Sequence, residues 1–168
     1  MSDLTNPADI SSVDTSSNSK INCYGPKARR KVFNNRMGVT VFMFVPRKPG
    51  MSIEAFKDHY ENKHVPLVLR ALGDAKPVSH TRYYCQRNPA AQGDAEVPPP
   101  LLYMGDVNTI DYDCITIMEL EDEAHFKRFN EAFETSPLKK DVEADQKIFA
   151  DESKFKILAV ESPRVSRR

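Results

Sequence analysis

The chain of 168 residues has few cysteines, few glycines and no long apolar run. Its cysteines, Cys23, Cys85 and Cys114, are odd in number and widely spaced, which gives neither a CxxC metal pair nor an obvious disulfide framework. The six glycines form no P-loop and no GxGxxG motif, and the chain has no GxSxG elbow. No run approaches the roughly 20 apolar residues of a membrane span, and Met1 to Lys20 lack the apolar segment of a secretory signal. We therefore expect a cytoplasmic protein with free thiols and no membrane partner.

Net charge is also absent, because 24 basic residues balance 24 acidic ones. The balance conceals an uneven distribution: residues 1–36 carry a net charge of +3, residues 37–163 carry −6, and residues 164–168 carry +3. An acidic body argues against a surface that grips nucleic acid phosphates. We predict a disordered basic tail over 1–36, one domain over 37–163 and a loose basic C-terminus over 164–168. Deletion of the tail is expected to leave activity largely intact.

Apolar patterning predicts four strands and two helical regions. The strands are expected at 38–45, 78–87, 112–119 and 155–160. A helix is expected from Ile53 to about Leu72, with Ser52 as N-cap, and Pro66 should kink it or end it just after His64. A second helical region should begin near Glu121 and, after a break at Ser136–Pro137, continue to about Phe149.

The resulting order, β-α-β-β-α-β, is the ferredoxin-like pattern of α+β proteins. Four antiparallel strands with helices on one face leave the other face bare, and a second copy of the same chain is the simplest cover. Residues 88–110, with three consecutive prolines at 98–100, form a long connection typical of lids, binding loops or disordered insertions.

Tyr60 and His64 carry the strongest chemical signal. They are four residues apart, which places both side chains on the helix face that points toward the sheet. A histidine titrates near neutral pH and can both take and give a proton, so this pair could do acid–base work in an apolar pocket. The structural alternative is a core histidine satisfied by a backbone carbonyl, with Tyr60 as ordinary packing. His59 is expected at a solvated position, and its spacing of five from His64 should not place two metal ligands on one face.

Other candidates lie on the second and third strands. One face of the second strand carries His80 and the other carries Tyr83, and the pattern does not say which face meets the helices. If His80 faces inward it joins His64; otherwise His80 or Tyr83 lies in a subunit contact. Asp113 could orient a histidine or could be a turn or edge charge. His125 is expected to be exposed.

The segment Phe56–Leu67, FKDHYENKHVPL, resembles the EthD-domain family. That family has an aromatic residue, a few polar positions and His-x-Pro-Leu, followed by a tyrosine-rich strand such as Thr81–Tyr84. The stretch Phe133–Leu138 also fits, and the resemblance extends over about residues 38–160. It implies a dimeric α+β barrel, in which two ferredoxin-like sheets pack face to face in a homodimer. It also implies that His64 is the catalytic histidine.

The long start, the 88–110 insertion and the Ser-Pro-Leu segment look most like the fungal branch, whose members serve aromatic polyketide pathways. This resemblance implies a lyase without cofactor, either a decarboxylase of an anthrone or atrochrysone-type carboxylic acid or a dehydratase of a naphthopyrone precursor. From the spacing of the histidines we expect no metal site. Alternatives are a non-catalytic aromatic-ligand carrier or accessory protein, and a cofactor-free oxygenase. We assign Tyr60 and His80 to catalysis with His64. The residues expected to bind substrate are Phe42, Phe56, Tyr83 and Asp113.

Overall fold

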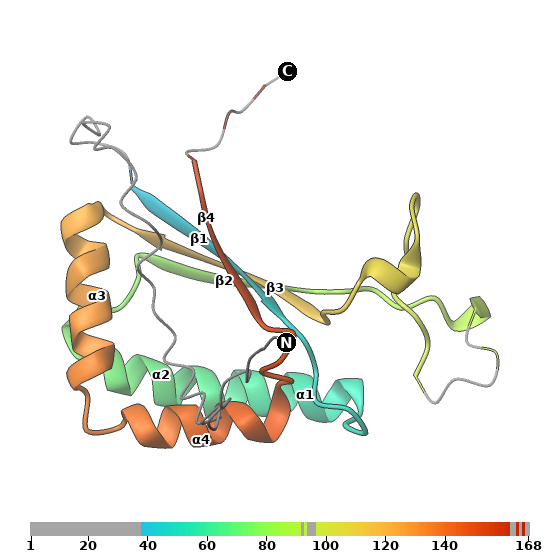
Figure 1. Cartoon of the computed structure of the whole chain (residues 1–168), viewed down its shortest axis with the longest axis horizontal. Helices are drawn as coiled ribbons and strands as arrows, with labels where there is room; N and C mark the ends of the chain where they lie inside the picture. The colour runs from blue at the N-terminus through green and yellow to red at the C-terminus, as the bar shows by residue number, and fades with distance from the viewer. Residues whose placement is uncertain (1–37, 92, 94–96, 162–163, 165, 167–168) are drawn as a thin grey trace, which may run out of the picture. The chain divides into compact units, whose positions relative to one another are not determined.

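The structure is a computed structural model that describes residues 38–91, 93, 97–161, 164 and 166 (Figure 1). The tail predicted over 1–36 and Cys23 lie outside the described residues. The strands are β1 (Val39–Val45), β2 (Ser79–Tyr84), β3 (Cys114–Leu120) and β4 (Lys156–Val160). The helices are α1 (Ile53–His59), a π turn (Tyr60–His64), α2 (Val65–Leu72), α3 (Glu123–Thr135) and α4 (Lys139–Phe149).

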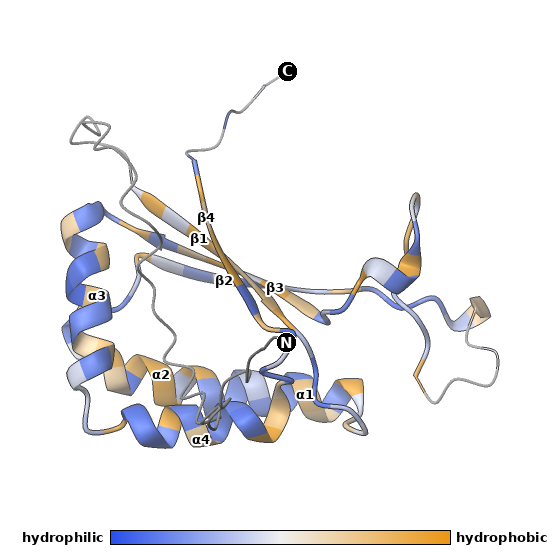
Figure 2. Cartoon of the chain, in the orientation of Figure 1, coloured by the Kyte–Doolittle hydropathy of each residue, from blue (hydrophilic) through white to orange (hydrophobic). Residues whose placement is uncertain are grey.

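The four strands form one antiparallel sheet in the order β2-β3-β1-β4. This order and the β-α-β-β-α-β succession confirm the predicted ferredoxin-like fold. Helices α1, α2, α3 and α4 lie on one side of the sheet (Figure 1). They alternate between apolar and polar residues, as helices with one buried face do, whereas the strands are mainly apolar (Figure 2).

The two faces of the sheet have different partners. Val41 and Val45 of β1 are buried against the helices, in register with Met118 and Cys114 of β3. The core between the layers also contains the fully buried rings of Phe56 and Phe149 and the ring of Tyr60. Because side chains alternate along a strand, the opposite face carries a second apolar set. We call it the open face; its members are Phe42, Phe44, Ile115, Ile117 and Leu158.

Of the two outcomes predicted at Pro66, the end of the helix just after His64 is wrong. The helix passes through the π turn and continues to Leu72. The backbone N–H of Val65 bonds to the carbonyl of Tyr60, five residues earlier. Pro66 has no N–H and would crowd the carbonyl four residues before it in an α-helix, so one wider turn in front of it relieves both problems. Ser52 is the N-cap, with its Oγ accepting from the Ala55 N–H at 3.1 Å.

The prediction that His125 is exposed is wrong. Only 6% of its surface is accessible, because it lies in the first turn of α3 above the end of the first helical region. Its Nδ1 accepts from the N–H of Glu121 at 3.3 Å, and its Nε2 donates to the carbonyl of Lys76 at 3.0 Å. His125 therefore ties the helices together as a structural residue.

The connection between β2 and β3 has ordered parts. Backbone bonds from Asn88 to Pro99 and from Leu101 to Gln86 fold its two ends against each other, at 2.9 and 2.8 Å. We call residues 97–110 the arm. In Figure 1 the arm extends past the end of the sheet and does not lie over the helices.

Asp113 anchors the arm at its base. Its carboxylate accepts from the backbone N–H of Arg47 at 3.1 Å and pairs with the guanidinium of Arg87. These contacts fit the alternative of a turn or edge charge for Asp113.

Candidate functional site

Two histidines from the first helical region bind one carboxylate from α4. Nε2 of His59 lies 2.9 Å from Oδ1 of Asp145, and Nδ1 of His64 lies 2.8 Å from Oδ2. Both histidines are buried, with 6% and 7% of their surface accessible. The predictions that His59 is solvated and that the two histidines cannot share a face are therefore wrong. A π turn brings residues five apart to the same side of the helix, and we call these three residues the His–Asp–His cluster.

Phe149 forms the apolar platform of this cluster. Its ring is fully buried and its centroid lies 5.2 Å from that of His59 and 4.7 Å from that of His64. Asp145 and Phe149 are one helical turn apart on α4, so a single helix supplies both the hydrogen-bond acceptor and the surface on which the rings stack. The orientation of His64 is thus fixed by packing as well as by hydrogen bonding.

His64 is neutral at pH 7. Burial lowers its pKa below the usual value, the nearby His59 adds to this effect, and Asp145 opposes it without reversing it. Because Nδ1 carries the proton that it donates to Asp145, Nε2 has a free lone pair. This arrangement is the one a general base requires.

Tyr60 lies beside His64, with 5.7 Å between ring centroids, and 3% of its surface is accessible. Its hydroxyl shares a hydrogen bond of 2.9 Å with Oγ1 of Thr116 on β3. Burial raises the pKa of Tyr60 well above its usual range, so the side chain stays a phenol and can donate a proton in a hydrogen bond.

Strand β2 turns His80, Arg82 and Tyr84 toward the helices, which settles the open question of its faces. Arg82 Nε and the Tyr84 hydroxyl donate to the same oxygen of Glu61, in the π turn, at 2.8 and 2.7 Å. Burial raises the pKa of Glu61, but these hydrogen bonds outweigh it and the net shift is downward, so Glu61 is a carboxylate.

His80 lies on the same inward face. Its Nε2 is buried and has no hydrogen-bond partner among the residues that the structure describes. Burial, with the like charge of Arg82 next in importance, lowers the pKa of His80 to about 4, and His64 contributes to the same shift. His80 is consequently neutral at pH 7.

The remaining predicted residues lie elsewhere. Phe56 is in the core, with its ring centroid 6.0 Å from that of Tyr60. Tyr83 and Phe42 point to the open face, and Asp113 lies at the base of the arm. The structure places His64 beside Tyr60 and in contact with Asp145, which sequence reasoning missed, and turns His80 toward the same side of the sheet.

One signal could have revealed Asp145. It lies between two buried residues of α4, three positions after Val142 and four before Phe149, which is the spacing of an inward helix face. A carboxylate on such a face needs a buried partner, because an unpaired charge there is costly.

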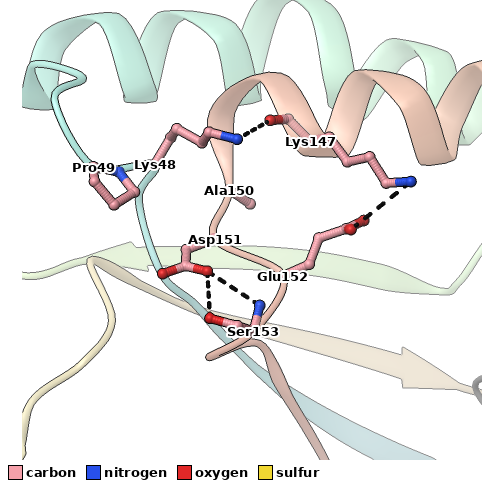
Figure 3. Close-up of a pocket in the computed structure, with 7 residues that line it drawn as sticks. All are labelled: Lys48, Pro49, Lys147, Ala150, Asp151, Glu152 and Ser153. Atoms are coloured by element: carbon pink, nitrogen blue, oxygen red, sulfur yellow. Dashed lines mark hydrogen bonds and ion pairs between the residues drawn. The ribbon is translucent and has the colours of Figure 1, made fainter. Parts of the chain in front are cut away.

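Two hollows of the described surface lie outside the His–Asp–His cluster. Figure 3 shows one of about 340 Å³ beside the end of α4, where the Lys48 Nζ donates to the carbonyl of Lys147 at 3.0 Å. Its lining mixes lysines with Asp151 and Glu152, and none of its residues belongs to the cluster. In the described ranges, no group of His, Cys, Asp and Glu side chains is arranged to hold a metal ion. Across the same part of the chain, no helix has the length and apolar character needed to cross a membrane.

Several solved structures are similar to this chain. An EthD-like protein from Ralstonia eutropha JMP134 is 15% identical, with a TM-score of 0.46, over 79% of this chain and 96% of that one. An ethyl tert-butyl ether D family protein from Bacillus halodurans C-125 is 15% identical, with a TM-score of 0.46, over 74% and 99%. A dimeric ferredoxin-like protein of unknown function from Thermobifida fusca YX is 9% identical, with a TM-score of 0.43, over 80% and 100%.

None of the curated proteins compared with the chain matches it. A family model does: the model of the EthD domain matches residues 48–153, well over half of the chain and the whole of the segment that carries the His–Asp–His cluster. The chain therefore belongs to the EthD domain family.

Proposed function

We propose that this EthD-domain protein is a cofactor-independent lyase that acts on an aromatic polyketide intermediate, with His64 as the acid–base group. The observation that carries the proposal is the hydrogen bond between Nδ1 of His64 and Asp145, which leaves Nε2 unprotonated beside the Tyr60 phenol. The polyketide branch is supported by the resemblance of the sequence to fungal members of the family.

The two candidate reactions share an enol or enolate. In a dehydration, Nε2 of His64 takes a proton from the carbon beside a ketone. The imidazolium then gives this proton to the departing hydroxyl as the C–O bond breaks, so that water leaves. In a decarboxylation, Nε2 of His64 takes the proton of the substrate's carboxylic acid, the C–C bond to that carboxylate breaks and CO₂ leaves, and the imidazolium returns the proton to the carbon. In both, Tyr60 donates a hydrogen bond to the developing oxyanion, and one such donor contributes about 3 kcal/mol.

His80 is the proposed substrate-binding residue. Its unpartnered Nε2 can pair with a phenolic or ketone oxygen of the substrate, which would satisfy a buried polar atom. It belongs to β2, an edge strand of the sheet, so we propose that substrate enters along this edge. Phe42, Tyr83 and Asp113 point elsewhere, and we assign them no contact with substrate.

A homodimer is part of this proposal. The open face carries phenylalanine, isoleucine and leucine side chains, and a second copy packed on it would form the α+β barrel that the family resemblance implies. Some solved structures similar to the chain are described as dimeric, which agrees with this arrangement.

The test compares His64→Gln with His125→Gln. Both replace a buried histidine, but the hydrogen bonds of the His125 ring go to backbone groups of Glu121 and Lys76, so it controls for the loss of a structural histidine. Each protein is incubated with a panel of fused-ring polyketides and products are read by mass. We expect loss of CO₂ or of water with the wild type, a fall in kcat of at least about 100-fold for His64→Gln, and wild-type kcat for His125→Gln.

Three outcomes would contradict the proposal. Unchanged turnover by His64→Gln would remove the acid–base role. Binding of the panel without any product after long incubation would indicate a carrier or accessory protein. A gain of oxygen that stops under anaerobic conditions would indicate a cofactor-free oxygenase.

A further inference from the structure

The tip of the arm is the most exposed apolar segment in the described part of the chain. Tyr103 and Met104 are 92% and 90% exposed, and Leu101 and Leu102 before them are 36% and 37% exposed. Four consecutive apolar side chains at the end of a projecting segment cost free energy in water, because each leaves apolar area solvated. A contiguous exposed group of this kind marks an interaction site more often than isolated surface residues do.

The arm is an ordered element with fixed ends. Asp106 caps its short helical turn Val107–Thr109, accepting from the N–H of Asn108 at 2.9 Å, and its carbonyl accepts from the Thr109 hydroxyl at 2.7 Å. At the start of the arm, the backbone pairing of Leu101 with Gln86 holds it against the end of β2. A preorganised tip loses little conformational entropy when it binds.

The arm rises on the side of the sheet that the helices leave uncovered (Figure 1). At its base, the Tyr112 ring lies 5.0 Å from the ring of Phe44, a member of the open face. Lys156, the register partner of Phe44 on β4, donates to Asp111 at 2.7 Å. The apolar surface of the open face is thus continuous with the base of the arm, and whatever covers that face lies beside the arm.

We propose that the arm tip, Leu101–Met104, docks on a second copy of this chain packed against the open face. This inference rests on the homodimer that is part of the proposed function. It adds that the arm tip belongs to the interface of that homodimer. In a two-fold dimer the arm of each chain contacts the other chain, so the interface contains two copies of this contact.

Area supports the need for the arm. Four strands of about six residues cover on the order of 400 Å² in projection, from the usual strand spacing and rise. Stable interfaces bury roughly 800 Å² on each partner. The two arms supply further apolar area at the rim of the sheet contact.

The charge of the arm favours a protein partner over a membrane. Residues 97–110 contain no Lys or Arg, and their only charged residue is Asp106. Segments that insert into the headgroup region of anionic membranes are rich in basic residues. The open face of a second copy is made of apolar side chains, so the arm needs no basic residue to bind it.

The experiment uses the full chain. In the double variant Tyr103→Ser/Met104→Ser the apolar tip is removed, and in Ile148→Ser a side chain that is 58% exposed is removed from α4, on the helical side of the sheet. Sedimentation equilibrium then gives the dimer dissociation constant. We expect a rise of at least about tenfold for the double variant and none for Ile148→Ser, with circular dichroism verifying that each variant is folded.

A second measurement maps the contact directly. A photoreactive phenylalanine at position 103 should crosslink between two chains, to peptides that contain β1 or β4. A monomeric wild type at 100 µM, an unchanged dissociation constant in the double variant, or crosslinks confined to one chain would each overturn the inference. A membrane role would also overturn the inference. In that case the wild type, but not the double variant, would bind vesicles of phosphatidylcholine and phosphatidylserine, and the two proteins would have the same dimer dissociation constant. Because no substrate is present, absence of lyase activity would not alter either readout.

Discussion

The partly buried carboxylate of Asp145 has two imidazole partners, one on each oxygen. Each partner must present an N–H, so the carboxylate fixes which nitrogen of each ring is protonated. For His64 this leaves Nε2 free, whereas His59 uses Nε2 for the hydrogen bond itself. The two histidines therefore have different roles. His64 can exchange protons with a substrate, and His59 holds Asp145 in place.

Substitution of Asp145 by Asn should test the role of Asp145 in positioning His64. An amide keeps the size of the side chain but can accept from only one of the two rings, because its other end is a donor. We expect kcat to fall about 10- to 100-fold with a small change in KM. The acid limb of the kcat–pH profile should move to lower pH, because Asp145 raises the pKa of His64 and its removal lets that pKa fall further.

Glu143→Gln, which alters an exposed carboxylate of the same helix, is the matched control and should behave as wild type. A profile of Asp145→Asn that coincides with the wild-type profile would mean that Asp145 does not position His64.

Among the elements, the π turn between α1 and α2 determines the relation of His59 to His64. In a regular α-helix, residues five apart differ by about 140° around the axis and point in different directions. The wider turn removes this difference, and Pro66 provides the physical reason for it. The π turn interrupts the regular α-helix at the position where it brings His59 and His64 to the same side.

Pro66→Ala should convert the π turn toward α geometry, because the new N–H can bond to the carbonyl of Asn62. We expect the melting temperature to change by only a few degrees, since the added backbone hydrogen bond offsets the weaker hydrogen bonding of the histidines to Asp145. Turnover should fall strongly as His64 rotates away. Pro137→Ala, in the turn before α4, controls for proline loss. Full activity in Pro66→Ala would show that the π turn is dispensable.

The sequence predicts the elements better than it predicts the site, for physical reasons. Short runs of β-branched, aromatic and other apolar residues predicted the positions of the strands to within three residues at their ends, because such runs are typical of strands that pack on a core. The π turn adds one residue to a single helical turn, which a pattern of apolar spacing does not register. Asp145 is 81 residues from His64, and a contact over that distance depends on how α4 packs. His64 and Tyr60 were found because their contact is local.

For the whole molecule, the buried neutral histidines make stability depend on pH. The pKa of His80 is lowered to about 4 in the folded chain, and that of His64 is also lowered, whereas an unfolded histidine titrates near 6.5. Between these values the unfolded state binds more protons than the folded state. The free energy of unfolding therefore decreases as pH falls from about 6.5 to about 4.

Thermal melts at pH 7.5 and pH 4.5 should show this loss, and His80→Gln should reduce the difference between the two pH values because it removes one proton-binding group from the unfolded state. Equal differences for the wild type and His80→Gln would place the acid sensitivity elsewhere, for example in the paired carboxylate of Glu61, whose pKa is also lowered.

The division of the His–Asp–His cluster between α1, the π turn and α4 has a consequence for synthesis of the protein. The chain emerges from the ribosome N-terminus first, and both histidines appear more than eighty residues before their carboxylate and its aromatic platform. Until α4 has been made and docked, the two imidazoles have no common acceptor and His64 no fixed tautomer. On the proposed mechanism, the protein becomes catalytically competent only when α4 has packed against the first helical region. A chain released before α4 is made could not become competent.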